Sequence, residues 1–231
     1  MSLISVILST YNEPCDMIVK SIDSILNQTY RTFELILIND NPAREELDIL
    51  LNKYEKSDSR IIYNKNTENE GLVYCLNKAV GLATGDYIAR MDADDISRPD
   101  RLELQLKFMQ KHNYDIVGTC IEKIDEEDTP IDVLMLPSHH ENIVEYISFG
   151  SCVLHPTWLV KKDVYKKLEG YRDIKACEDY DFLLRAIRAG FKLGNIPQIG
   201  LEYRIRLTGI SQSTSVRQKL TMYYLASELC E

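Results

Sequence analysis

The sequence contains no apolar run long enough to cross a bilayer, and it begins without the basic segment that opens a signal peptide. A membrane-spanning helix needs roughly 18 or more consecutive apolar residues. The opening apolar segment turns polar at Ser9, which is typical of a first strand. We therefore expect a cytoplasmic protein, and these features leave peripheral contact with the inner face of a membrane open.

Positive charge is also scarce. The 27 Lys and Arg residues are outnumbered by 36 Asp and Glu residues, which gives a formal net charge of −9. Neutralising a nucleic-acid backbone takes concentrated basic residues, so we expect no nucleic-acid partner. A small anionic ligand is still compatible with this charge, because a bound cation can reverse the potential within one cleft.

Cysteine pairs are missing as well. The six cysteines include no CxxC pair, and no histidine lies at zinc-ligand spacing from them. We expect reduced thiols, most of them in the core. The chain has 231 residues, of which 45% are apolar, and is therefore long enough to bury a sizeable core.

What the sequence does contain is a regular alternation of apolar runs and amphipathic segments. The predicted strands cover residues 3–8, 33–38, 60–63 and 86–91, and the predicted helices cover residues 14–27, 43–54 and 72–83. This alternation predicts a parallel sheet with right-handed crossovers, whose ligands bind beyond the carboxyl ends of the strands. Polar residues gather at all four of these ends, at 10–12, 39–40, 64–69 and 92–95.

The most acidic of these strand ends is the segment 92–95. If the strand stays extended, Asp92 and Asp94 project to the same side and can share a cation. Mg²⁺ and similar hard cations take one or two protein carboxylates and complete their shell with water and phosphate oxygens. One hypothesis is thus a metal-assisted phosphate site. The alternative is a solvated acidic turn before the next helix, for which Ser97 and Asp100 predict a capping box.

The second half of the chain contains two denser stretches. His155 and Trp158 end an apolar run, where turn chemistry with a core tryptophan is the simplest interpretation. The segment 177–185 predicts a helix whose first turn holds Glu178 and Asp179 at the positive end of the helix dipole. Asp179 then either caps the helix or acts as a general base. The acidic run 122–128 predicts a solvated hairpin or loop, residues 192–196 and 199–206 two closing strands, and residues 215–229 a terminal helix.

Four stretches occur together in a specific order. They are VILSTYNE at residues 6–13, Asn69-Glu70-Gly71 followed by Leu76-Asn77, GDYIARMDADD at residues 85–95, and EDYDFLLR at residues 178–185. In this order and spacing they resemble the family 2 glycosyltransferases of the GT-A fold, over residues 3 to about 206. His155-Pro156-Thr157 is also similar to a segment of many bacterial members.

The resemblance implies an α/β fold of the GT-A type, with a Rossmann-like, mainly parallel central sheet flanked by helices. It implies an inverting hexosyl- or N-acetylhexosaminyltransferase that uses a nucleotide-diphospho-sugar and Mn²⁺ or Mg²⁺. We expect a UDP-sugar, because the N3–H of uracil suits an acceptor such as Asp40. The expected acceptor is a hydroxyl of a saccharide or a lipid-linked saccharide, in surface polysaccharide or glycan synthesis.

On the donor side, the resemblance makes Asp94 the main metal ligand, and Asp92 lies at the ribose or shares the metal. Thr10, Tyr11 and Asp40 form the base pocket, in which Tyr11 stacks on the base. The remaining donor-side residues implied by the resemblance are Glu13, Gly71 and Arg90.

On the acceptor side, Asp179 matches the catalytic base that removes the proton of the acceptor hydroxyl. Glu178 would orient nearby groups, while His155 and Trp158 would line the acceptor or donor-sugar side. We expect residues 1–231 to form one catalytic domain, with a nucleotide-binding half at 1–112 and an acceptor-binding half with a terminal helix at 113–231. The sequence lacks the long extension of polymerising relatives, which favours transfer of a single sugar.

One departure from the family pattern concerns the second strand. It ends in Asn39-Asp40-Asn41-Pro42, where many relatives have two acidic residues followed by Gly-Ser, so the base preference is less defined. Three alternatives have weaker support. An inactive sugar-nucleotide-binding module would not need Asp179, a nucleotidyltransferase would need a Gly-rich basic loop after the first strand, and a phosphatase would need its DxD on that strand.

Overall fold

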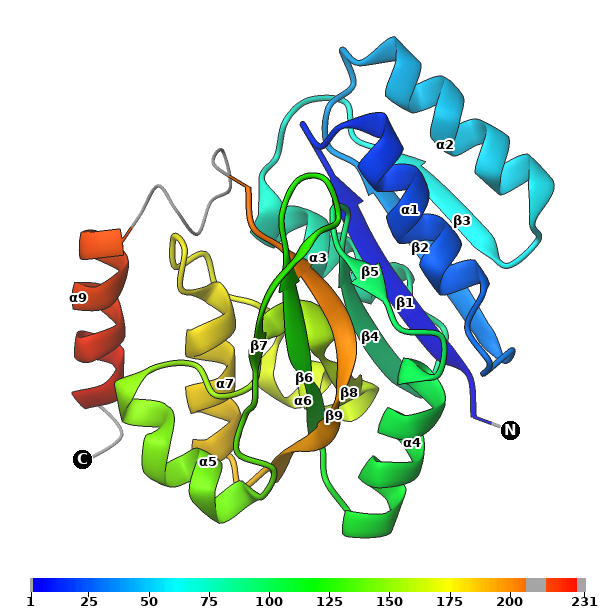
Figure 1. Cartoon of the computed structure of the whole chain (residues 1–231). Coiled ribbons are helices and arrows are strands. Elements are labelled where there is room, and N and C mark those ends of the chain that lie inside the picture. The colour runs from blue at the N-terminus through cyan, green and yellow to red at the C-terminus, as the bar shows by residue number, and fades with distance from the viewer. Residues whose placement is uncertain (1, 207–214, 228–231) are drawn as a thin grey trace.

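The computed structural model describes residues 2–206 and 215–227. Within them, nine strands form one sheet in the order β3-β2-β1-β4-β8-β6-β9-β5, and β7 pairs with β6 (Figure 1). The strands are β1 (Ile4–Thr10), β2 (Phe33–Asn39), β3 (Ile61–Lys65), β4 (Tyr87–Asp92), β5 (Ile96–Ser97), β6 (Ile116–Ile124), β7 (Pro130–Leu134), β8 (Leu159–Lys161) and β9 (Leu193–Arg204). The helices are α1 (Cys15–Leu26), α2 (Glu45–Ser57), α3 (Leu72–Leu82), α4 (Arg101–His112), α5 (His140–Tyr146), α6 (Lys162–Leu168), α7 (Glu178–Arg188) and α9 (Ser215–Ser227), with the short 3-10 turns η1 (Ile147–Phe149) and η2 (His155–Thr157).

The first four strands are parallel, as the alternation of strands and helices predicts. β1 lies between β2 and β4, β3 lies beside β2, and α1, α2 and α3 provide the crossovers. The carboxyl ends of the four strands therefore meet at one edge of the sheet. We call this edge, marked by Thr10, Asn39, Lys65 and Asp92, the carboxyl edge.

Successive strand residues face two different helical layers, because side chains alternate along a strand. Val6 and Leu8 pack in a core with residues of α1, α2 and α4. Ile7 and Ile88 pack on the opposite face with residues of α3, α6 and α7. Figure 1 shows α1, α2 and α4 on one side of the sheet and α6, α7 and α9 on the other.

The second half of the sheet is mixed. The short strand β8 is antiparallel to both β4 and β6, while β9 runs parallel to β6. The two closing strands predicted at 192–196 and 199–206 are one strand, β9, whose register against β6 shifts near Cys120. Pro197 lies at this irregularity, where its missing N–H costs no ladder hydrogen bond.

One local prediction is wrong and another is incomplete, because distant strands determine these segments. Ser97 does not cap α4: it belongs to β5 and pairs with Leu201, and the residue before α4, Asp100, makes no side-chain cap hydrogen bond. The acidic run 122–128 does form a hairpin with β7, but it is not simply solvated. Asp128 pairs with Lys20 of α1 and with Arg204 of β9.

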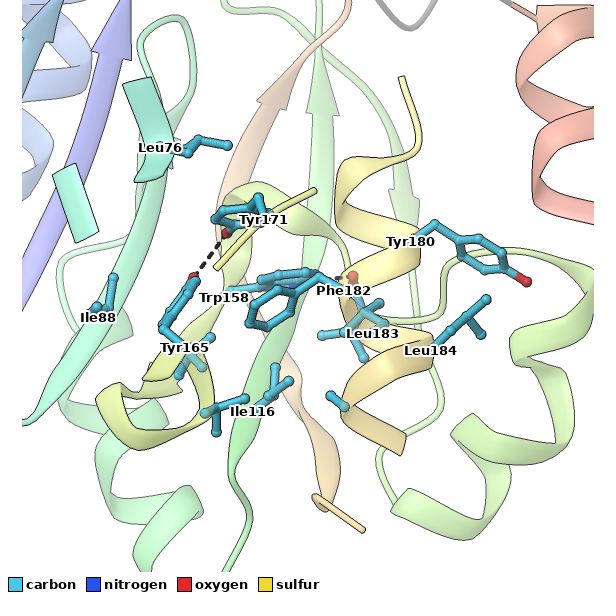
Figure 2. Packing of buried hydrophobic residues seen from close by; sticks show 14 of the residues in the cluster. Leu76, Ile88, Ile116, Trp158, Tyr165, Tyr171, Tyr180, Phe182, Leu183 and Leu184 are labelled. Atoms are coloured by element: carbon cyan, nitrogen blue, oxygen red, sulfur yellow. Dashed lines mark hydrogen bonds between the residues drawn. The ribbon is translucent and has the colours of Figure 1, made fainter. Parts of the chain in front are cut away.

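A cluster of buried aromatic side chains lies between β8, α6 and α7. Trp158 and Tyr171 stack with ring centroids 6.4 Å apart, and Phe182 contacts both rings (Figure 2). The hydroxyl groups of Tyr165 and Tyr171 lie 2.9 Å apart, and His155 Nε2 lies 2.9 Å from the Tyr171 hydroxyl. This polar chain satisfies groups that would otherwise be buried without partners.

The remaining predictions concern the thiols and the terminal helix. Five cysteines are free thiols, of which Cys75, Cys120 and Cys177 are buried, while Cys230 lies outside the described residues. The helix predicted at 215–229 is α9, and residues 228 and 229 also lie outside them. In the part of the chain that the structure describes, no helix is both long and apolar enough to cross a membrane.

Candidate active site

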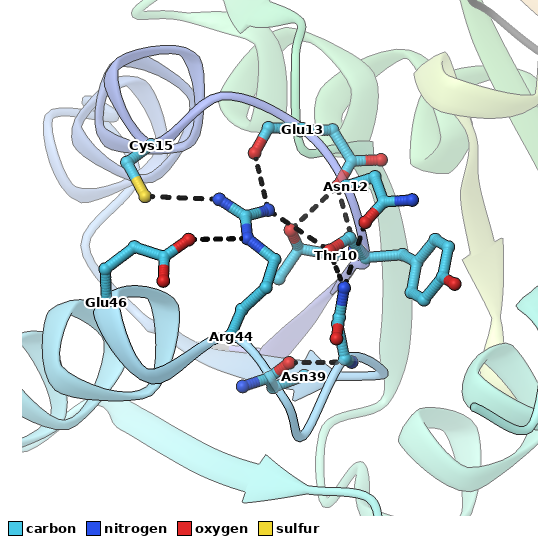
Figure 3. Close-up of polar contacts among 9 residues, drawn as sticks. Thr10, Asn12, Glu13, Cys15, Asn39, Arg44 and Glu46 are labelled. Carbon is cyan, nitrogen blue, oxygen red and sulfur yellow. Dashed lines mark hydrogen bonds and ion pairs between the residues drawn. The ribbon is translucent and has the colours of Figure 1, made fainter. Parts of the chain in front are cut away.

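The loop after β1 is stabilised by hydrogen bonds to one carboxylate (Figure 3). The Thr10 hydroxyl and the Tyr11 backbone N–H both donate to Glu13 Oε2, each at 2.8 Å. Thr10 is buried at the end of β1, whereas 41% of Tyr11 is exposed. The loop thus holds an accessible aromatic ring at the carboxyl edge, as expected of a residue that stacks on a base.

Asp40, directly after β2, is buried and anchors the next loop of the carboxyl edge. Its Oδ1 accepts hydrogen bonds from the Asn66 side chain at 2.6 Å and the Glu70 N–H at 2.9 Å. Its Oδ2 accepts from the Asn69 side chain at 2.8 Å and the Gly71 N–H at 2.9 Å. The contact between Asp40 and a base N–H stays a prediction, and such a donor would compete with these four.

Gly71 lies in the same loop and is the residue before α3. Its φ of 87° lies in the left-handed region, which glycine adopts at little cost. The conformation aims its N–H at Asp40, so the sequence motif that includes Gly71 shapes the loop.

The acidic segment after β4 differs from the extended conformation that the sequence analysis assumed. β4 ends at Asp92, and Ala93 and Asp94 form a turn, so strand alternation does not place the two carboxylates on one side. Asp92 instead forms an ion pair with Arg90, and Asp94 Oδ2 lies 3.1 Å from Arg206. Asp95 is buried and accepts a hydrogen bond from the Arg204 N–H at 2.8 Å, as a structural residue would.

The two carboxylates of this turn still influence each other. Burial, followed by the negative charges of Asp92 and Glu13, raises the pKa of Asp94 to about 6, while Arg206 opposes the shift. Carboxylate oxygens are the ligands that Mg²⁺ and Mn²⁺ prefer. The residues therefore fit a divalent cation held by Asp94 and Asp92, which would offset the crowding of negative charge.

Arg90, which the resemblance implies as a donor-side residue, is buried and not accessible to a ligand. Only 3% of this side chain is exposed, and its Nε has no hydrogen-bond partner. The position on β4 points the guanidinium into the core beneath the carboxyl edge. Besides its ion pair with Asp92, the positive charge of Arg90 partly opposes the rise in pKa that burial causes at Glu178 and Asp179.

Glu178 and Asp179 form the first turn of α7, as predicted. The Tyr180 N–H donates to Asp179 Oδ1 at 2.7 Å, so part of this carboxylate caps its own helix. Burial raises the pKa of Asp179, although this hydrogen bond and Arg90 oppose the shift. Burial and the neighbouring charge of Asp179 raise the pKa of Glu178 to about 7. A carboxylate with a raised pKa is a stronger base than a solvated one.

Trp158 and His155 do not line an accessible site, so this expectation is corrected. Trp158 is 0% exposed, and its indole N–H donates to the Val153 carbonyl at 2.9 Å. His155 is buried against Tyr171, and burial and the Arg90 charge lower its pKa well below the usual value. Both residues belong to the aromatic cluster, as the simpler interpretation of their sequence proposed.

Three arginines that contact the predicted site were not singled out from the sequence. Arg44 lies beneath the Tyr11–Glu13 loop, and Arg204 and Arg206 contact the acidic turn. Arg204 donates to the Asp94 carbonyl at 2.7 Å and to the Asp125 carbonyl at 2.7 Å. No local pattern marks these residues, because their partners are distant in the sequence.

The mixed, mostly parallel sheet, flanked by helices and with carboxylates at its carboxyl edge, defines an α/β protein. Residues 5–169 match the family described as glycosyl transferase family 2, and the chain belongs to this family. It is 37% identical over 229 residues to the O-antigen biosynthesis glycosyltransferase WbnJ of Escherichia coli. This match covers 97% of this chain and 88% of WbnJ.

Solved structures confirm the GT-A fold. S. aureus TarS in complex with UDP-GlcNAc superposes with a TM-score of 0.76 at 19% identity, covering 99% of this chain and 66% of TarS. The mannosyltransferase PcManGT from Pyrobaculum calidifontis, in complex with GDP-Man and Mn²⁺, gives a TM-score of 0.74 at 18% identity, covering 99% and 64%. This chain thus spans about two thirds of the length of both solved chains.

Proposed function

We propose that the protein transfers a single sugar, with inversion, from a nucleotide-diphospho-sugar to a hydroxyl of a saccharide or lipid-linked saccharide. A UDP-sugar is the favoured donor, and surface polysaccharide or glycan synthesis is the favoured process. Support comes from family membership, from the O-antigen role in the name of WbnJ, and from the UDP-GlcNAc bound to TarS. The GDP-Man complex of PcManGT makes a GDP-sugar the alternative donor.

The observation that supports this proposal most is the electrostatic connection between the two ends of the site. Asp92 and Asp94 follow β4, Glu178 and Asp179 begin α7, and the buried charge of Arg90 acts on Asp92 and on Asp179. A transferase needs carboxylates at both places, one set for the leaving diphosphate and one for the acceptor proton. A module that only bound the donor would need the first set alone.

We propose the following roles for the residues of the site. Asp179 is the general base that takes the proton of the acceptor hydroxyl as its oxygen attacks the sugar C1, opposite the diphosphate. Thr10, Tyr11 and Glu13 hold the nucleotide, together with the loop that Asp40 and Gly71 shape. Asp94, with Asp92, would hold Mn²⁺ or Mg²⁺, whose positive charge offsets the charge that develops on the leaving diphosphate.

Two substitutions test the proposal. Asp179→Asn should reduce transfer at least a hundredfold and leave the Kd for the donor nearly unchanged, because it removes the base while keeping the side-chain shape. Asp94→Ala should instead weaken binding of a nucleoside diphosphate with Mn²⁺. The donor is selected by thermal shift with UDP-, GDP-, CDP- and dTDP-sugars, because a ligand that binds the folded state raises its stability. Full turnover by Asp179→Asn would reject the base assignment, and donor binding without any turnover by the wild type would favour a binding module.

A further inference from the structure

The Tyr11–Glu13 segment, which the proposed function places against the nucleotide, has little regular structure of its own. It lies between β1 and α1, and the residue before α1 is Pro14, which offers no side-chain cap. The hydrogen bonds to the Glu13 carboxylate tie the loop to Thr10 at the end of β1 and to its own backbone, but not to any neighbouring element. Groups outside the loop must therefore fix its position.

Arg44, in the turn between β2 and α2, supplies that attachment (Figure 3). Its Nη1 donates to the Tyr11 carbonyl at 3.1 Å and to the Glu13 carbonyl at 2.9 Å. Its Nη2 lies 3.4 Å from Cys15 Sγ, and its Nε donates to Glu46 at 2.8 Å. One guanidinium thus contacts both ends of the loop and the first residue of α1, with 19% of its side chain exposed.

Asn41, in the same turn, adds a second attachment. Its side chain donates to Asn12 Oδ1 at 2.9 Å and to the Tyr11 carbonyl at 3.3 Å. The Asn41 N–H in turn donates to Asn39 Oδ1 at 2.9 Å, which fixes the turn to the end of β2. The turn after β2 therefore holds the Tyr11–Glu13 loop through its backbone and Asn12, while leaving Tyr11 exposed.

We propose that Arg44 is a positioning residue for donor binding, which holds the Tyr11–Glu13 backbone in its binding conformation from the side opposite the ligand. This inference deepens the proposed function and rests on it. A loop that is already ordered loses less conformational entropy when the ligand binds, and this raises affinity without a direct contact. The planar fork of arginine reaches two carbonyls, which the single ammonium of lysine does not reproduce.

The test compares Arg44→Met and Arg44→Lys with the wild type. The probe is a nucleoside diphosphate, chosen from UDP, GDP, CDP and dTDP by the largest thermal shift with Mn²⁺, and its Kd is measured by titration calorimetry. We expect the Kd of Arg44→Met to rise roughly tenfold and that of Arg44→Lys to rise less. The kcat of both variants for sugar transfer should stay within about twofold of the wild-type value. A merely structural role would lower the stability without this selective loss of affinity.

Two control variants separate positioning from general stability. Arg60 is a matched arginine, with 28% of its side chain exposed, that pairs with Asp58 and lies 4.3 Å from the Phe33 ring at the opposite edge of the sheet. Arg60→Met should lower the melting temperature about as much as Arg44→Met but leave the Kd unchanged. Glu46→Gln removes only the ion pair between Arg44 and Glu46, whose own side chain is 63% exposed. It should change neither the melting temperature nor the Kd.

The outcomes distinguish the inference from the function on which it rests. If the wild type binds the probe and Arg44→Met binds it equally well, or if Arg60→Met weakens binding to the same degree, the positioning role is rejected and the transferase proposal stands. If none of the four diphosphates binds the wild type with Mn²⁺, the proposed function and this inference are both rejected. A tenfold loss of affinity confined to the Arg44 variants supports the inference.

Discussion

The two ends of the candidate site are built differently. On the donor side, the loops that follow β1 and β3 are held at the carboxyl edge by hydrogen bonds that Arg44 donates and Asp40 accepts. On the acceptor side, Glu178 and Asp179 begin a helix, α7, whose own Phe182 ring packs against the buried ring of Trp158. Binding and stability should therefore be separable on the donor side and strongly linked on the acceptor side.

Trp158→Ala should give the largest effect and tests this difference most directly. The ring is fully buried, so its removal leaves a cavity within the aromatic cluster, and the Val153 carbonyl loses one of its two hydrogen bonds, keeping the one from the Ser151 hydroxyl. Such substitutions cost about 3–5 kcal/mol. We expect a fall of that size in the free energy of unfolding measured by urea denaturation, with loss of activity at ordinary temperature as its consequence.

Trp158→Phe is the control for this prediction. It keeps an aromatic ring and loses the indole N–H, so its cost should be clearly smaller, about 1–3 kcal/mol. If Trp158→Ala were as stable as the wild type but inactive, the tryptophan would act on the acceptor rather than on the core. The contrast between the two sides of the site would then be lost.

Glu178→Gln should give the next largest effect, and in the opposite direction. Burial raises the pKa of Glu178 from 4.5 to about 7 in the folded protein. The contribution of Glu178 to the stability of the wild type is therefore greatest below about pH 4.5, where the group is protonated in both states. This contribution is lost as the pH rises to about 7. Glutamine does not ionise, so the variant should be more stable than the wild type by up to about 3 kcal/mol at pH 8.

The measurement is urea unfolding of both proteins between pH 5 and pH 8. The stability difference should grow with pH and level off above about pH 7. Glu145→Gln, at an exposed position of α5, provides the control for the same substitution made outside the site. A constant difference between Glu178→Gln and the wild type across this range would contradict the raised pKa.

The sequence predicted the parallel half of the fold and the edge at which the site lies. Apolar periodicity is a local property, and the strands and helices from Ile4 to Asp92 follow it closely. The position of Asp179 in the first turn of a helix was predictable for the same reason. These features depend on residues a few positions apart, whose pattern a single sequence displays.

Features that depend on distant partners were not predictable. Ser97 is of a residue type that often caps helices, yet pairing with Leu201 makes it part of a strand. Arg90 lies in a motif that implies a donor-side residue, but its position on β4 buries the side chain in the core, where it pairs with Asp92. Arg44 carries no local signal at all, because its partners are carbonyl groups of another loop.

Asp40→Asn should have the smallest effect on stability and tests the donor side of the comparison. Asparagine can accept hydrogen bonds at one oxygen only, and its NH₂ group would face two of the four donors that Asp40 now satisfies. We expect a loss of about 1–2 kcal/mol in the free energy of unfolding, as for a loop anchor rather than a core residue. The Kd for a nucleoside diphosphate with Mn²⁺ should rise more than tenfold, because the loop from Asn66 to Gly71 is no longer fixed. Asn52→Asp, at a half-buried position of α2, is a control of similar chemistry that should leave the Kd unchanged. If Asp40→Asn instead unfolded the protein as severely as Trp158→Ala, the donor loops would be part of the core, and binding and stability would be linked on both sides of the site.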